Sequence, residues 1–250
     1  MRCLCKIWTR VSTVLVAGVV LAMMAGAGPA HANGAGAGIV GSPHDFSAET
    51  WNFRGEICRV CHVPHDHQRA AQLYLNGLLW NHQVSAATYT MYDASWSSSL
   101  DGAQSGQPDG IAKMCLGCHD GTVAIDQFDK NLNDDATGTD GVPNFPLITD
   151  INVDFLVPGF ADGSNLDLRG THPLSIAYDP VADTNLNVVT NTMGTSGTIA
   201  DVLDAGKVQC SSCHDVHDQE SVPGTHLLRV AQSIAQGGVA SGLCLTCHIK

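Results

Sequence analysis

Cys58-Arg-Val-Cys61-His62 is the first of four motifs that share the pattern C-x-x-C-H. The other three are Cys115-Leu-Gly-Cys118-His119, Cys210-Ser-Ser-Cys213-His214 and Cys244-Leu-Thr-Cys247-His248. This pattern is the attachment signature of c-type haem. Its spacing suits that chemistry, because two thiols separated by two residues add to the two vinyl groups of one porphyrin and the adjacent histidine binds the iron. The motifs therefore predict four covalently bound haems c.

Two other uses of paired cysteines explain the motifs less well. Eight cysteines in an exported protein can form four disulfides, but disulfides do not account for a histidine after every second cysteine. Paired C-x-x-C motifs also bind zinc, yet zinc sites do not require histidine at the same position four times. The motifs use every cysteine beyond residue 32, and haem attachment accounts for all of these features together.

The first 32 residues are typical of a secretory signal peptide. Arg2, Lys6 and Arg10 make the start positive, residues 11–24 form an apolar run of 14 residues, and Ala30-His31-Ala32 fits the small-x-small cleavage pattern. The run is shorter than the ~20 apolar residues that span a bilayer. Cleavage after Ala32 is therefore favoured over a retained anchor, and we expect an exported chain.

Cleavage leaves an acidic chain of 218 residues with eight cysteines and eleven histidines. The loss of three basic residues takes the formal net charge from −12 to −15. An acidic chain without a basic stripe is a poor match for nucleic acid, because phosphate contacts need Lys and Arg. No second apolar run has the length of a membrane span, so we expect no nucleic-acid partner and no membrane span after cleavage.

The mature sequence contains two similar halves. The order H-x-x-S, C-x-x-C-H-x-x-H-D, C-L-x-C-H runs from His44 to His119 and again from His172 to His248. Between them the chain is rich in Asn, Asp, Gly and Thr, which is typical of a long surface connection. The predicted organisation is a signal peptide (1–32), a first dihaem half (33–125), a connection (126–171) and a second dihaem half (172–250).

Little regular secondary structure is evident in the sequence pattern. Short helices are expected at 47–58, 198–208 and 227–236, the last with apolar residues near the helical period, and residues 148–157 resemble a strand. Aromatic residues make up only 6%, and four porphyrins would supply the flat apolar bulk that a core otherwise takes from aromatic side chains. The expected fold is mostly irregular, with short α-helices and few strands, wrapped around four covalently bound haems.

Distance limits the choice of a second ligand for each iron. His65 follows His62 by three residues, which span at most ~11 Å. Crossing to the other face of the same haem needs roughly 13 Å, with metal–imidazole bonds of ~2 Å. We therefore expect His65 to bind the iron of a neighbouring haem, and His217 to do the same relative to His214.

The repeat supplies two such histidines per half. The motif histidines His62, His119, His214 and His248 take one side of each iron, and the predicted second ligands are His44, His65, His172 and His217, with His82 in reserve and with His67 and His226 less favoured. If the two haems of one half stack, His65 serves the haem at Cys115 and Cys118, and His217 serves the haem at Cys244 and Cys247. His44 and His172 then serve the first haem of each half, unless a ligand is exchanged across the repeat or between subunits.

The doubled blocks resemble the multihaem cytochromes c of the bacterial periplasm and outer surface that carry C-x-x-C-H motifs in pairs. The stretches similar to tetrahaem members are Leu79-Trp80-Asn81-His82, Tyr89-Thr-Met-Tyr92, Cys118-His-Asp-Gly-Thr-Val-Ala124 and Leu243-Cys-Leu-Thr-Cys-His248. The resemblance covers residues 44–124 and 167–250. It implies a location in the periplasm or at the outer surface, and some members assemble into extracellular haem filaments. Fold and cofactor alone do not identify the redox partner.

Two classes of function are compatible with these features. One is an electron carrier with four low-potential haems, each held by two histidines, which serves redox protein partners or an extracellular acceptor. The other is a multihaem oxidoreductase, which needs one open iron position. Every motif ends in histidine and spare histidines are present for the second positions, so we expect a carrier rather than an enzyme, with no catalytic residues. A homo-oligomer or filament subunit is compatible with the carrier.

The motifs generate a direct prediction of haem content. Protein purified from a host with haem-attachment machinery should carry four haems per chain and stay red after denaturation, because thioether bonds survive unfolding. Pyridine haemochrome absorbance and intact mass measure this. A mass equal to the bare polypeptide, or to the polypeptide plus zinc, would contradict it.

Overall fold

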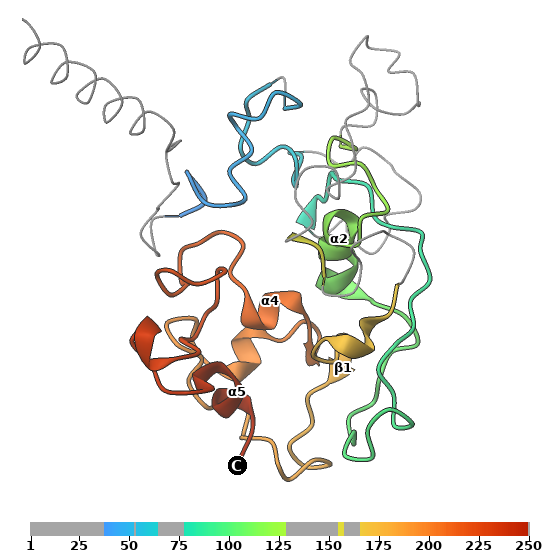
Figure 1. Ribbon diagram of the computed structural model, residues 1–250, viewed down its shortest axis with the longest axis vertical. Helices are drawn as coiled ribbons and strands as arrows, with labels where there is room; N and C mark the ends of the chain where they lie inside the picture. The colour runs from blue at the N-terminus through green and yellow to red at the C-terminus, as the bar shows by residue number, and fades with distance from the viewer. Residues whose placement is uncertain (1–37, 53, 65–77, 129–154, 158–165, 250) are drawn as a thin grey trace, which may run out of the picture. The chain divides into compact units, whose positions relative to one another are not determined.

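The computed structural model describes residues 38–52, 54–64, 78–128, 155–157 and 166–249. These residues belong to a compact unit that spans Asn33–Lys250. The expected fold class is confirmed in its coarse form, since the described chain is mostly irregular, with a few short helices and one two-stranded antiparallel sheet (Figure 1). Among the described residues, no helix combines the length and the apolar character needed to cross a membrane.

The α-helices of the described chain coincide with C-x-x-C-H motifs. Helix α2 (Gly110–His119) ends on the second motif, α4 (Cys210–Cys213) is the third motif itself, and α5 (Gly242–Cys247) carries the fourth. The remaining elements are the short 3-10 helices η4 (Leu168–Gly170), η5 (Ile199–Val202) and η6 (Ile234–Gln236) and the strands β1 (Ile176–Ala177) and β2 (Lys207–Val208). In the sheet Ile176 pairs with Val208 and Ala177 with Lys207.

The expected short helices are largely replaced by turns. The described residues of 47–58 (47–52 and 54–58) form successive turns, because the Asn52 side chain donates to the carbonyls of Phe46 and Glu56 and Gly55 takes a left-handed φ of 61°. Only residues 199–202 of the second expected helix and 234–236 of the third are helical. Of the strand-like run 148–157, only 155–157 are described, and they form no strand.

A small apolar core surrounds α2 in the first half. Leu116 is 1% exposed and belongs to one buried cluster with Trp51, Val60, Tyr89 and Phe128. Trp51 and Phe128 meet edge to face, with ring centroids 6.3 Å apart. Because Leu116 lies between Cys115 and Cys118, this packing holds the second motif from behind and leaves the cysteines themselves only partly buried.

A polar network joins the start of α2 to the start of α4. Asp109, which precedes α2, accepts hydrogen bonds from Lys207 Nζ, from Ser105 Oγ at 2.8 Å and from Gln209 Nε2 at 2.9 Å. Asp204 accepts from the Ile111 N–H at 3.0 Å, so a residue of the second half satisfies a free amide at the start of α2. The two halves are therefore fastened together where the second and third motifs begin.

This network predicts an acid-sensitive contribution to stability. Burial tends to raise the pKa of Asp109, but hydrogen bonds from Lys207 and its polar neighbours outweigh burial and lower it. A lowered pKa stabilises the fold above the unfolded value of ~4 and the contribution is lost as pH falls through the folded value. Asp109→Ala should reduce the free energy of unfolding by about 1–2 kcal/mol at neutral pH, and by less as the pH approaches the folded value.

Denaturant unfolding of the haem-loaded protein measures this effect, and Asp101→Ala provides the control. Asp101 is exposed and begins the same loop. Equal destabilisation by both substitutions, or an Asp109 effect that does not decline in acid, would contradict the proposed ion pair.

Candidate haem sites

Each described C-x-x-C-H motif folds as a single helical turn. The N–H groups of His62, His214 and His248 donate to the carbonyl of the first cysteine of their own motif at 2.7, 3.0 and 2.8 Å, and His119 lies in the last turn of α2. Residues three and four apart share one face of a helix. The turn therefore presents two thiols and an imidazole to the same side, which is the arrangement that attachment to one porphyrin requires.

A second segment of backbone holds the end of each motif. We call these the bracing segments, and they are residues 78–81, 155–157, 185–187 and 226–229. At the first motif the Asn81 N–H donates to Cys61 O at 2.9 Å, and at the third the Arg229 N–H donates to Cys213 O at 2.9 Å. The two positions correspond in the repeat, since Leu79 and Leu227 before them both take positive φ, 52° and 58°.

The bracing segments also orient three of the motif histidines. The Nδ1 atom of each of these histidines lies at hydrogen-bond distance from a backbone carbonyl. The distances are 2.7 Å from His62 Nδ1 to Leu78 O, 2.5 Å from His119 Nδ1 to Phe155 O and 2.7 Å from His214 Nδ1 to His226 O. A carbonyl only accepts, so the proton sits on Nδ1 and Nε2 keeps its lone pair. Metal-binding histidines are held in this way. The sequence motif did not reveal these carbonyls, because backbone groups leave no residue-type signal.

Three pairs of histidine rings lie at one common separation. The ring centroids are 6.1 Å apart for His44 and His119, 6.3 Å for His62 and His217, and 6.2 Å for His172 and His248. Each pair joins one motif histidine to one of the predicted second ligands. Two imidazoles that bind one metal from opposite sides, with bonds of ~2 Å, have centroids roughly 6 to 6.5 Å apart. The residues present therefore fit a metal held between two histidines at three of the four motifs.

The pairing of the rings differs from the expected one. His217 lies against His62, on the first motif of the other half, and not against His248. His44 lies against the second motif of its half, at His119, where the first was expected. His172 likewise lies against His248. The expectation assumed that stacking stays within one half, whereas the contacts between α2 and α4 bring the halves together and allow exchange across the repeat.

Among the described residues, no second histidine ring lies against the remaining motif histidine, His214. Its counterpart in the repeat is His62, which receives His217 from the other half. The residue that corresponds to His217 is His65, which lies outside the described residues, as does His67. The repeat therefore predicts that His65 serves the third motif.

The reserve ligand His82 is engaged elsewhere. Its ring is fully buried, with Nδ1 2.9 Å from Gln83 O and Nε2 3.1 Å from Ile125 O. Nε2 also lies 3.5 Å from the Cys118 sulfur. With carbonyls at both ring nitrogens, His82 connects its loop to residue 125 behind the second motif, and this arrangement does not support a role as iron ligand.

The thiols of successive motifs are neighbours. The Cys115 thiol hydrogen-bonds to Cys210, and together with burial it raises the pKa of Cys210. Burial, followed by the charges of Cys61 and Asp120, raises the pKa of Cys118, and burial followed by Cys247 and the other nearby thiols raises that of Cys213 to about 11. The motifs are thus adjacent in the order first, second, third and fourth. None of the eight cysteines, all within the described ranges, is in a disulfide.

The surroundings of His44 keep its imidazole neutral. Burial, followed by the charges of His119, His214 and His217, lowers the pKa of His44 to about 4. Within the described part of the chain its Nδ1 atom is buried without a hydrogen-bond partner. A neutral imidazole with an unsatisfied nitrogen is the form of histidine that binds a metal, and such a buried orphan otherwise costs stability.

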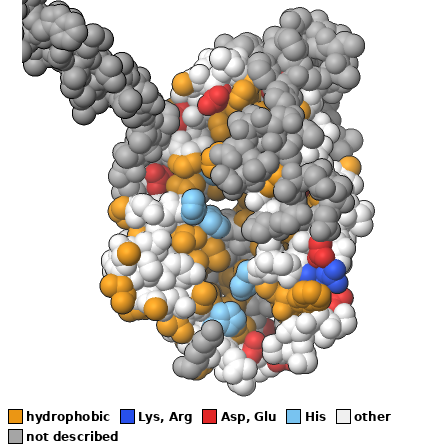
Figure 2. Space-filling model, viewed as in Figure 1, with side chains coloured by type: hydrophobic (Ala, Val, Ile, Leu, Met, Phe, Trp, Pro, Cys, Tyr) orange, Lys and Arg blue, Asp and Glu red, His pale blue; other side chains and the backbone are white. Residues whose placement is uncertain are grey.

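Figure 2 shows histidine side chains gathered beside hydrophobic side chains along a hollow on this face of the molecule.

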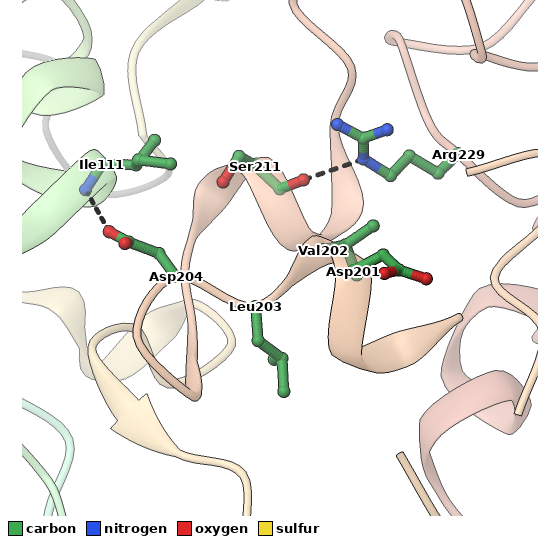
Figure 3. Close-up of a pocket in the computed structure, with 7 residues that line it drawn as sticks. All are labelled: Ile111, Asp201, Val202, Leu203, Asp204, Ser211 and Arg229. Atoms are coloured by element: carbon green, nitrogen blue, oxygen red, sulfur yellow. Dashed lines mark hydrogen bonds between the residues drawn. The ribbon is translucent and has the colours of Figure 1, made fainter. Parts of the chain in front are cut away.

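A separate cavity of about 240 Å³ lies where α2, η5 and α4 meet (Figure 3), and its lining contains Ile111, Asp201, Val202, Leu203, Asp204, Ser211 and Arg229. Arg229 Nε donates to Ser211 O at 2.9 Å across this cavity. The cavity contains no motif cysteine or histidine, but it places a guanidinium directly against α4.

Neither a protein-family model nor a curated protein sequence matches the chain. The function proposed below therefore rests on the residues of the chain itself.

The ring pairs predict which haem loses a ligand when His217 is removed. In His217→Ala the haem attached at Cys58 and Cys61 should become high-spin, which is about one quarter of the total iron. The haem attached at Cys210 and Cys213, beside the substituted residue, should stay low-spin. Paramagnetic NMR of the oxidised protein identifies the affected haem.

His226→Ala is the matched control, because the ring of His226 forms none of the three pairs. The carbonyl with which His226 braces the third motif is a backbone group, and the substitution keeps it. His226→Ala should leave the spin state of every haem unchanged. A high-spin haem at Cys244 and Cys247 in His217→Ala would instead support pairing within one half.

Proposed function

We propose that this chain is an exported tetrahaem cytochrome of the c type that carries electrons and performs no substrate chemistry. The observation that carries the proposal is the spacing of the three ring pairs, each of which joins a motif histidine to a histidine from elsewhere in the chain. Haem c, when bound, supplies one-electron exchange between ferric and ferrous iron. The chain supplies attachment, axial ligands, orientation and the electrostatic surroundings.

The residues have distinct roles in this proposal. The eight cysteines attach four haems, and His62, His119, His214 and His248 bind from one side. Together with the motif histidines, His44, His172 and His217 would hold the second, fourth and first haems, and the repeat assigns His65 to the third. The Nδ1 bonds to the bracing carbonyls fix the ring orientations, so that little rearrangement accompanies a change of iron charge.

The alternative function, an oxidoreductase with one open iron position, is restricted to the third motif. Within the described residues His214 is the only motif histidine without a second histidine ring against it. An exogenous ligand could reach the iron at that position alone, and only if His65 does not occupy it. Two histidines at every iron would leave no position for a substrate, which favours the carrier.

The electrostatic interactions between thiols of successive motifs support a continuous route through the chain. Cys61 is a neighbour of Cys118, Cys115 of Cys210, and Cys213 of Cys247. Haems attached at these positions would be adjacent in sequence order, so an electron received at one outer motif could leave at the other. The partners we propose are redox proteins or an extracellular acceptor, met in the periplasm or at the outer surface, by single chains or by a homo-oligomer or filament.

The proposed function predicts the spin state and the potentials of the bound haems. All oxidised irons should be low-spin, and most of the reduction should occur below zero millivolts, because histidine pairs lack the methionine that raises the potential of ordinary cytochromes c. The negative chain also favours the ferric form. Electron paramagnetic resonance and spectroelectrochemistry measure the two properties. A high-spin fraction in the wild-type protein would favour the oxidoreductase, and a dominant positive potential would contradict the ligand assignment.

A further inference from the structure

The residue that follows each motif histidine differs between the inner and the outer motifs. Val63 and Ile249 follow the first and fourth motifs, whereas Asp120 and Asp215 follow the second and third. Asp120 is 0% exposed and Asp215 is 5% exposed. A buried carboxylate therefore lies directly beside each of the two inner sites, and the partners of the two carboxylates differ.

Asp120 is surrounded by neutral donors. Its carboxylate accepts hydrogen bonds from the Tyr89 hydroxyl, from the Thr122 N–H at 2.8 Å and from Thr122 Oγ1 at 2.8 and 2.9 Å. No ion pair reaches Asp120 among the residues that the structure describes. These hydrogen bonds stabilise the carboxylate but bring no positive charge, so its negative charge is felt by its surroundings.

Asp215 has a cation beside it. It accepts from the backbone N–H groups of His217, Gln219 and Glu220 at 3.2, 2.7 and 2.7 Å, and Arg229 Nη2 lies 4.0 Å from its Oδ1. The Arg229 side chain is 14% exposed and also pairs with Glu220, which is 44% exposed and thus partly screened by water.

Arg229 is fixed to the third motif by two further bonds. Its N–H donates to Cys213 O at 2.9 Å. Its Nε donates to Ser211 O, also at 2.9 Å (Figure 3). The next carboxylate along the chain, Asp218, directly follows His217. Because the His217 ring lies against His62, Asp218 belongs to the first site rather than to the third. The positive charge of Arg229 therefore remains at the third site.

The two carboxylates therefore differ in the charge that faces them. Asp120 directly follows His119, and among the described residues its partners are hydroxyl and amide donors. Asp215 directly follows His214 and has Arg229 Nη2 4.0 Å from its Oδ1. The second site thus has a buried carboxylate without a cation, and the third has one with a cation beside it.

We propose that Asp120 makes the haem at Cys115 and Cys118 harder to reduce than the haem at Cys210 and Cys213, where Arg229 offsets the carboxylate. A negative charge favours the ferric form, which carries one more positive charge than the ferrous form, and a cation disfavours it. The field is strong because both carboxylates are buried, where the effective dielectric constant is lower than in water. The inference rests on the proposed function and adds a direction, because an electron on the second haem moves downhill to the third.

The wild-type protein alone provides the first test. Stepwise reduction followed by NMR, with haem methyl signals assigned to their attachment cysteines, gives the order in which the four haems are reduced. The haem at Cys210 and Cys213 should be reduced before the haem at Cys115 and Cys118. The reverse order, or equal midpoints, overturns the inference while four low-spin haems would leave the proposed function standing. Fewer than four haems would instead overturn the proposed function.

Variants test the cause of the order. Asp120→Asn should raise the midpoint of the haem at Cys115 and Cys118, and Arg229→Asn should lower that of the haem at Cys210 and Cys213. Asparagine is the matched replacement for Arg229, since Asn81 occupies the corresponding place in the first bracing segment and donates to Arg59 O at 2.5 Å.

Asp101→Asn, at an exposed carboxylate, is the control for a general change of charge. Each variant is compared only after pyridine haemochrome confirms four haems. Equal shifts of all four haems in Asp120→Asn, or no shift, would show that Asp120 does not set the potential of one site. If a variant does not retain its haems, the reduction order of the wild type decides.

Discussion

Three residues cannot carry a chain from one face of a porphyrin to the other, and under the proposed haem attachment much of the architecture depends on this limit. In the block C-x-x-C-H-x-x-H the second histidine must leave the site that its own motif forms. His217 does so by lying against His62, on the other half of the repeat. The halves therefore have to meet, and the structure provides the contact through Asp109, Lys207 and Gln209 at the starts of α2 and α4. Sparse secondary structure follows, since the backbone is committed to motif turns and bracing segments.

The cysteine motifs and the candidate ligand histidines can be proposed from sequence because they depend on residue type and short spacing. His44, His172 and His217 each lie against a motif histidine, as ligand candidates should. Which motif histidine each of them faces could not be predicted. The three-residue reach limit excludes only the haem of the histidine's own motif and does not choose among the other three. The helix expected at 227–236 forms only at 234–236, because Leu227 takes a left-handed conformation and its neighbours pair with the third motif. The hydrophobic period of a sequence does not show such pairing. It also does not show that the backbone carbonyls of Leu78, Phe155 and His226 hold the motif histidines.

The charges beside the motifs illustrate a second limit. Asp120 and Asp215 occupy the same place in the sequence pattern, yet one meets hydroxyl groups and the other a guanidinium that arrives from fourteen residues away along the chain. The same residue type after two C-x-x-C-H motifs thus acquires different electrostatic surroundings through partners that the motif does not specify. Asn81 and Arg229 make the same backbone contact, and only their side chains differ in charge. A repeated framework in this way permits each site to be adjusted separately.

The pairing of His62 with His217 also bears on how such a chain matures. The two residues are separated by more than half the length of the chain, and closing so long a loop has a large entropic cost when the only compensation is a few contacts. A metal clip between them would close that loop much as a disulfide does and would remove the same conformational freedom from the unfolded state. In the exported haem protein that we propose, the first motif would leave the export machinery well before His217, the residue that completes its site. The amino-terminal half would therefore wait, incompletely ligated, until the carboxy-terminal half had emerged.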